Sequence, residues 1–234
     1  MPNIRGIAMS TKQKLKIAVD ILMTAALLLL MPYALIGEAA HEWIGMGMLV
    51  LFVLHHILNH RWIKNLGRGK YTCIRAVQTV LAALILISIL GSMASGILLS
   101  RYVFAFLDIR GLTVLARSIH MFCAYWGFVL MALHLGLHWG MVTGLTGKWF
   151  KSPSAARTLF ARGISLAIAV YGIRAFMARG IPGYLLMQVH FVFFNYEEPV
   201  IFFILDYMAV MGLFVFVGYY FGRVLRNRKK KEKK

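Results

Sequence analysis

The sequence predicts an all-α membrane protein with about six transmembrane helices, and three observations lead to this prediction. Sixty per cent of the 234 residues are apolar and 15% are charged, whereas a soluble domain carries about 25% charged residues. The apolar residues form runs close to the 20 or so residues that a helix needs to cross a bilayer. The 26 Lys and Arg residues, against 8 Asp and Glu, cluster between those runs, as is typical of membrane flanks.

Five apolar runs meet the length requirement, and a sixth falls short of it. The five are residues 15–37, 41–60, 73–99, 118–143 and 199–222. The sixth, 163–178, is short and contains Arg174. Residues 181–198 are rich in aromatic side chains and predict a piece that lies at the membrane interface or re-enters the membrane. The first run is interpreted as a retained span, because it is longer than the apolar part of a typical signal peptide.

The distribution of basic residues predicts the orientation. Of the 26 Lys and Arg residues, 21 lie in the N-terminal segment, the 61–75 and 148–162 loops and the C-terminal tail; the other five are Arg101, Arg110, Arg117, Arg174 and Arg179. Cytoplasmic loops carry the excess of such charges, so both termini are expected to be cytoplasmic, in the inner membrane of a bacterium. The basic tail, 226–234, is interpreted as an anchor beside anionic membrane lipid, and no nucleic-acid partner is expected.

Seven of the eight histidines lie in the second and fourth predicted spans. Ionisable side chains are costly inside a bilayer and usually mark functional sites there. Each span contains a His-x13-His pair, His41 with His55 and His120 with His134. Fourteen residues turn a helix through about 1400°, close to four full turns, so the two histidines of a pair share a face roughly 21 Å apart along the axis.

The second and fourth spans run in the same direction, because one span separates them. His41 is therefore expected at the depth of His120, and His55 at the depth of His134, inside a bundle of the first four helices. Two neutral imidazoles that face each other are the axial ligands of a six-coordinate haem iron. The sequence thus predicts two haem groups, one near each membrane face, with these four histidines as iron ligands.

Other residues of these spans receive supporting or alternative roles. Arg117 and Arg61 are expected to meet haem propionates near the two membrane faces. His56, His60 and His138 are surplus, and an inner haem between His60 or His56 and His138 stays open as a second ligand set. Small residues are expected to give the haem room; they are Gly45, Gly47, Gly91, Gly96 and Gly127.

An acidic pair before the last span offers a second candidate site. Glu197 and Glu198 are placed to accept protons from a quinol, or to cap the helix that begins at Pro199; the cap is favoured. Arg174 and Asp206 are each costly alone in a bilayer, so they are expected to form an ion pair or to belong to the same quinol pocket.

The paired His-x13-His arrangement, together with Leu-His-His-Ile-Leu-Asn-His-Arg-Trp at residues 54–62, resembles the diheme b-type cytochromes. These include the cytochrome b of quinol–cytochrome c reductases, ferric-reductase transmembrane domains, and small bacterial proteins of a domain family of unknown function. The resemblance covers about residues 14–145 and implies haem b and electron transfer. Residues 1–145 are accordingly expected to form the diheme bundle, and 146–234 the C-terminal helices with the interfacial segment and the basic tail.

The expected function is electron transfer across the membrane between a quinone and a redox partner protein, as in a quinol-linked cytochrome subunit. No Gly-x-Gly-x-x-Gly, Walker or hydrolase motif is present, and the lack of a Cys-x-x-Cys-His motif favours non-covalent haem. Two alternatives stay open: a transition-metal transporter, whose ligands would converge at one depth, and a membrane anchor for a soluble partner. A homo-oligomer is left open as well.

Overall fold

The computed structural model describes residues 9–107, 111–147 and 154–231, and within them it contains helices and no strand. The helices are α1 (Thr11–Leu30), α2 (Tyr33–Ile36), α3 (Glu38–Leu58), α4 (His60–Lys64), α5 (Cys73–Leu99), the 3-10 turn η1 (Ala105–Leu107), α6 (Thr113–Gly147), α7 (Ala155–Ala178), α8 (Ile181–Leu185) and α9 (Val200–Lys231). In the described residues, α3, α5, α6, α7 and α9 are long and apolar enough to cross a membrane. The chain is an all-α, multi-pass membrane protein, which confirms the predicted fold class.

The first predicted span, 15–37, is divided in the structure. α1 begins behind a capping box, in which the Ser10 hydroxyl accepts the Gln13 N–H and the Gln13 side chain accepts the Ser10 N–H. It ends before Pro32, which has no backbone N–H to continue the helix. Because three lysines and Asp20 stand in its first half, α1 is less apolar than the five spans, and a sixth crossing stays a prediction.

The sixth predicted run is longer than the sequence analysis proposed. α7 begins at Ala155, eight residues before the predicted start at 163, because the Ser154 side chain caps it by accepting the Arg157 N–H. With 24 residues it is one of the five helices that can cross a membrane. Because Arg157 and Arg162 stand in its first turns, the apolar pattern did not indicate where the helix begins.

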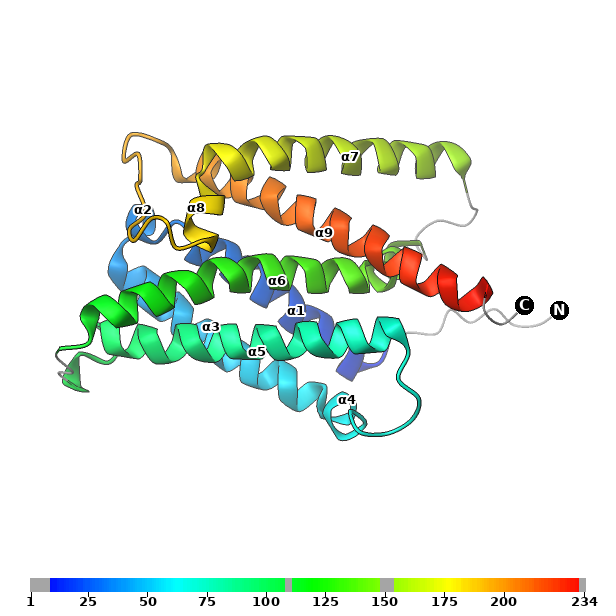
Figure 1. Ribbon diagram of the computed structural model, residues 1–234, viewed down its shortest axis with the longest axis horizontal. Coiled ribbons are helices and arrows are strands. Elements are labelled where there is room, and N and C mark those ends of the chain that lie inside the picture. The colour runs from blue at the N-terminus through cyan, green and yellow to red at the C-terminus, as the bar shows by residue number, and fades with distance from the viewer. Residues whose placement is uncertain (1–8, 108–110, 148–153, 232–234) are drawn as a thin grey trace.

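The helices run side by side along the long axis of the molecule (Figure 1). The start of α1, the end of α9 and α4 lie at one end, which we call the terminal end. At the other end, the α8 end, lie α2, η1, α8 and the segment 186–199 (Figure 1). Several basic residues used in the orientation argument lie outside the described residues; they belong to segments 1–8, 108–110, 148–153 and 232–234.

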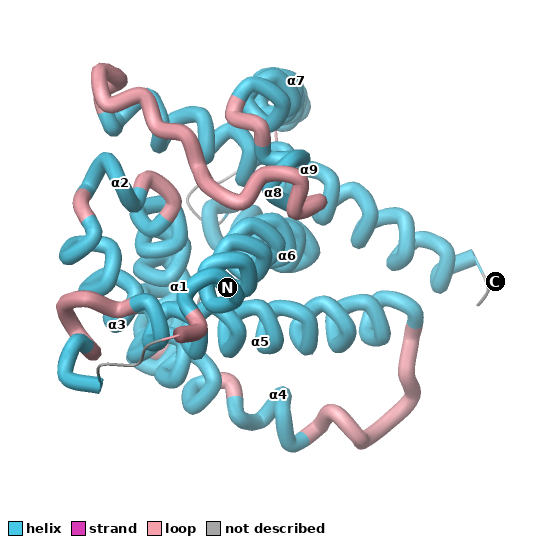
Figure 2. Tube along the Cα trace, turned by 60° about the vertical axis from the view of Figure 1, so that its left-hand side comes forward, coloured by secondary structure: helices cyan, strands magenta, loops and turns pink. Residues whose placement is uncertain are grey.

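The helix α6 lies in the middle, between α5 on one side and α9 with α7 on the other (Figure 2). The α6–α9 crossing is close because it is lined with glycine: a Cβ at Gly136 would collide with the backbone of Val215, and one at Gly218 would lie 2.5 Å from the carbonyl oxygen of Leu133. Small residues at such crossings let membrane helices approach each other.

The helices α1 and α3 pack closely against each other but make few backbone contacts with α5 and α9. The rings of His41 in α3 and His120 in α6 meet between these two helices. One core includes Leu27, Met48, Phe128, Ile181 and Val210, from both sides of residue 145. The division into 1–145 and 146–234 stays a prediction about function, because packing joins the two parts.

Candidate functional site

His41, near the start of α3, and His120, in α6, lie side by side although 78 residues separate them in the chain. Their ring centroids are 6.0 Å apart and the ring planes are inclined by 70°. A metal–imidazole bond is about 2 Å long, so two imidazoles bound to one metal ion from opposite sides have centroids roughly 6 Å apart. The separation of these two rings fits a pair of axial ligands.

The protonation of His120 is fixed by its neighbours on α5. Its Nδ1 lies 3.0 Å from the carbonyl oxygen of Ser92 and 3.2 Å from the hydroxyl of Ser95. Because a carbonyl only accepts, Nδ1 carries the proton and donates it to Ser92. The other nitrogen, Nε2, is then unprotonated, which is the form in which an imidazole binds a metal.

Two buried nitrogens lack partners in the described residues. They are Nδ1 of His41 and Nδ1 of His134, and no other buried side-chain nitrogen or oxygen of the described chain is without a hydrogen bond. A buried polar atom left unpaired costs free energy and calls for an explanation. One of these two histidines belongs to each predicted haem layer.

The inner layer gathers at the terminal end of the bundle. The ring of His134 lies 4.7 Å from that of His138, and the ring of His55 packs against that of His56 with centroids 5.6 Å apart. Nδ1 of His55 lies 2.8 Å from Oδ1 of Asp20 in α1. The sequence analysis gave Asp20 no role, although a carboxylate inside an apolar run was a signal that it has a partner.

The alternative inner ligands are placed less favourably. Nδ1 of His56 bonds to the carbonyl oxygen of Phe52 at 2.9 Å, and its ring packs on the Phe52 ring. The helix α3 ends at Leu58, so His60 belongs to the separate helix α4 and is exposed. His56 and His60 therefore stand on two different helices.

The glycines expected to give room for haem divide into two groups. A Cβ at Gly47 would meet open space, and one at Gly45 would only touch a Leu30 methyl group at 3.9 Å. By contrast, a Cβ at Gly91 would lie 2.5 Å from Sγ of Cys123, and Gly127 faces Ser88. Gly91 and Gly127 therefore serve the contact between α5 and α6. A Cβ at Gly96 would lie 3.4 Å from the ring of His120.

The two arginines assigned to haem propionates are both exposed. Arg117 precedes His120 by one turn of α6, at the α8 end. Arg61 lies in α4, at the terminal end. Each arginine thus lies at the end of the bundle that its predicted role requires. In the described residues, neither arginine contacts a histidine of either layer.

The acidic cluster at the α8 end is organised by Arg179. Its Nη1 and Nη2 donate to the two oxygens of Glu198 at 2.7 and 2.5 Å, and its Nε donates to Oδ2 of Asp206 at 2.8 Å. The hydroxyl of Tyr171 donates to the other Asp206 oxygen at 2.6 Å. Hydrogen bonds to Glu198 raise the pKa of Arg179 further above its usual range, so one cation is paired with two carboxylates.

This arrangement corrects one expectation from the sequence. The partner of Asp206 is Arg179, and the predicted ion pair with Arg174 is not formed; the Arg174 guanidinium instead lies 5.9 Å from the ring of Tyr171. The carboxylate of Glu198 is bound by Arg179, and the Glu197 N–H donates to the Asn195 side chain; the capping of α9 by these two residues stays a prediction. Sequence reasoning missed Arg179 because it lies just after α7 and was counted only as a loop charge.

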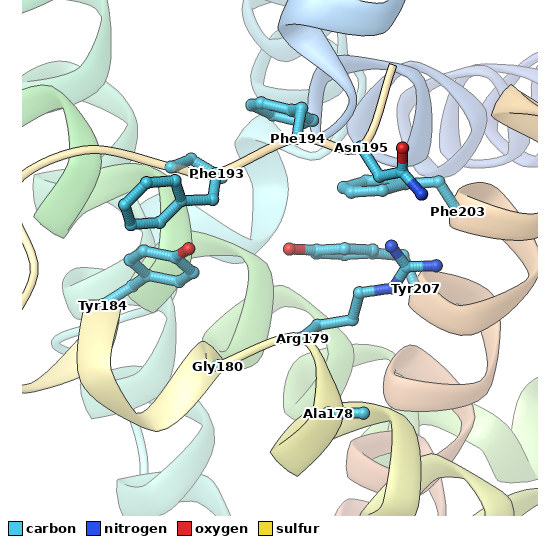
Figure 3. A pocket seen from close by; sticks show the side chains of 10 residues that line it. Ala178, Arg179, Gly180, Tyr184, Phe193, Phe194, Asn195, Phe203 and Tyr207 are labelled. Carbon is cyan, nitrogen blue, oxygen red and sulfur yellow. The ribbon is translucent and has the colours of Figure 1, made fainter. Parts of the chain in front are cut away.

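A cavity of about 460 Å³ adjoins this cluster (Figure 3). It is bounded by the end of α7, by α8, by the segment 192–195 and by α9. The lining side chains shown in Figure 3 include Arg179, Tyr184, Phe193, Phe203 and Tyr207. The cavity is therefore mainly aromatic, with one guanidinium.

Comparison with family models, curated proteins and solved structures gives no match for this chain. Within the described residues, no three His, Cys, Asp or Glu side chains are grouped so that they could hold a bare metal ion. The two histidine layers and the cavity beside Arg179 are therefore the candidate functional sites.

Proposed function

We propose that the protein is an integral-membrane diheme cytochrome b that carries electrons across the inner membrane of a bacterium. The observation that carries the proposal is the pairing of His41 with His120, with ring centroids 6.0 Å apart, between two helices whose backbones stay apart. Haem b, when bound, supplies one-electron chemistry at its iron.

The outer layer is the better defined of the two. His41 and His120 are the proposed axial ligands, and the hydrogen bond from Nδ1 of His120 to Ser92 leaves its Nε2 free for iron. The glycines Gly45 and Gly47 leave space on the same stretch of α3. Arg117, one turn before His120, is the proposed propionate partner.

In the inner layer, His55 and His134 are the proposed ligands, with His138 as a neighbour. Asp20 holds Nδ1 of His55 and so directs its other nitrogen away from α1. The two layers are roughly 21 Å apart along the helices, which covers most of the hydrocarbon thickness of a bilayer of about 30 Å. Electrons that enter at one end of the bundle thus have a route to the other.

The proposed electron donor or acceptor at the α8 end is a membrane quinone, and a redox partner protein serves the other end. Because the basic residues concentrate at the terminal end, we place that end in the cytoplasm. Neither a transition-metal transporter nor an anchor for a soluble partner is favoured by a specific observation in the described residues, so we do not propose them.

The first test is the haem content of the purified protein. A pyridine haemochrome assay is expected to give two non-covalent haems per chain, with low-spin spectra. His41→Ala and His120→Ala are expected to remove the same haem and leave the other, because the two layers are separate. The matched control is His190→Ala, an exposed histidine of the segment 186–199, which should keep both haems. A haem content near zero in the wild-type protein would refute the proposed function.

A further inference from the structure

The cavity beside Arg179 is lined mainly by aromatic rings. Tyr184 and Tyr207, both buried, line it, and Figure 3 shows their hydroxyl groups pointing towards each other. Phe203 stacks on Tyr207 with centroids 4.6 Å apart and planes inclined by 17°. Aromatic faces of this kind stack with other aromatic rings, and the volume of about 460 Å³ lies in the range of ligand pockets.

The charges at the cavity favour a neutral ligand. The charged group that lines it is the guanidinium of Arg179, which disfavours a cation. All three nitrogens of that guanidinium are already engaged with Glu198 or Asp206, so little of its charge is left for an anion. The hydroxyl of Tyr184 and the amide nitrogen of Asn195 offer neutral hydrogen-bonding groups, whereas the Tyr207 hydroxyl contacts that of Tyr125 at 3.5 Å and Oδ1 of Asn195 accepts the Glu197 N–H.

The segment that lines one side of the cavity also carries exposed apolar side chains. Phe193 lines the cavity and is itself 75% exposed. Other exposed apolar side chains of the same segment are Leu186, Met187, Phe191 and Tyr196. An exposed apolar surface beside a membrane-spanning bundle suits a ligand that arrives from the lipid and carries an apolar tail.

A chain of ring contacts joins the cavity to the outer histidine layer. Phe194, at the rim of the cavity, packs edge-on against Tyr33 with centroids 5.1 Å apart. Tyr33 in turn packs edge-on against His41 at 5.8 Å. Two ring contacts therefore lie between the cavity and His41, a proposed iron ligand. The three rings belong to the 186–199 segment, α2 and α3.

From these observations we infer that the aromatic cavity beside Arg179 binds the ring of a membrane quinol, between Tyr184 and Tyr207, next to the outer haem layer. The inference rests on the proposed function for its electron acceptor. It replaces the sequence-based quinol site, since Arg174 does not pair with Asp206 and Glu197 does not line the cavity.

The reaction balances with the groups of the proposed function. Oxidation of one quinol to quinone releases two electrons and two protons. The electrons would pass one at a time towards His41, and haem b held by the proposed histidine ligands of the two layers would supply one one-electron acceptor in each layer. The protons pass to the carboxylates of Glu198 and Asp206, which are bound to Arg179, and from there to water at the α8 end.

The test uses labelling of the full chain in detergent with a photoreactive azidoquinone, followed by peptide mapping. We expect the label in residues 178–207. Ala178→Trp places a large ring at the cavity, because Ala178 lines it and is exposed, and should reduce labelling at least tenfold. The matched control is Ala161→Trp, another exposed alanine of α7 at the opposite end of the helix, which should label like the wild-type protein.

The outcomes separate this inference from the proposed function. Labelling elsewhere, or labelling that Ala178→Trp leaves unchanged while haem content is normal, overturns the inference and leaves the diheme proposal standing. Labelling of residues 178–207 in a protein without haem supports the quinone site and refutes the diheme proposal. Protection by tetramethylammonium would identify the cavity as a cage for cations and would overturn the inference.

Discussion

At the scale of single residues, Asp20 and Arg179 show what a sequence hides. Both were visible as charged residues in or beside apolar runs, and neither could be given a partner from spacing alone. Their partners, His55 in α3 and Glu198 before α9, lie 35 and 19 residues away. A helix pattern predicts which residues share one face, but it does not predict which face of another helix they meet.

Asp20 also gives a prediction at this scale, which depends on the proposed haem. Its carboxylate bonds to Nδ1 of His55 at 2.8 Å and so raises the basicity of the other nitrogen, which favours ferric over ferrous iron. Asp20→Asn is expected to raise the midpoint potential of the inner haem by about 60–120 mV, since such partners change metal affinity by about 10–100-fold and tenfold is about 59 mV for one electron. Optical redox titration measures the shift.

The outer haem is the internal reference for this variant. His120 bonds to the neutral carbonyl of Ser92, so its haem should keep its potential in Asp20→Asn. Ser95→Ala, which removes the weaker neutral contact of His120, is the matched control and should shift the outer potential by less. An equal shift of both haems, or no shift, would contradict the role given to Asp20.

At the scale of helices, apolar runs predicted α3, α5, α6 and α9 well, because these runs contain few charges. The apolar runs did not predict where α7 begins or where α3 ends. The early start of α7 was masked by Arg157 and Arg162, and the break at Asn59, which separates His60 from α3, had no strong breaker residue in the sequence. The close α6–α9 packing was also not predicted, because glycines spaced along a helix do not identify the partner helix.

The α6–α9 crossing leads to a prediction about stability. Gly136→Ala is expected to destabilise the protein by about 1–3 kcal/mol, because the added methyl group meets the backbone of Val215 and Gly218. Gly140→Ala, one turn further along α6, adds its methyl group to open space and should be neutral or stabilising, since alanine favours helix over glycine. Thermal unfolding in detergent compares the two variants; equal unfolding temperatures would contradict the close crossing.

At the scale of the whole molecule, the two histidine layers follow each other along the bundle from the α8 end to the terminal end. The cavity and the pair of His41 and His120 lie towards the α8 end, and His55 and His134 lie towards the terminal end, where the basic residues concentrate. If the layers act in series, each is needed for transfer across the membrane, whereas the outer one alone can still accept one electron from a quinol at the cavity.

Reduction of the outer haem by quinol and electron transfer across the membrane are therefore expected to be separable. Liposomes that contain ferricyanide at the terminal-end side test this. With duroquinol added at the α8-end side, the wild-type protein should reduce the enclosed ferricyanide. In His134→Ala, the outer haem should still be reduced by duroquinol, while ferricyanide reduction falls at least tenfold because the inner layer is lost. His190→Ala is the matched control and should behave like wild type. Ferricyanide reduction at the wild-type rate in His134→Ala would mean that electrons leave without passing the inner layer, and transfer through two layers in series would be wrong.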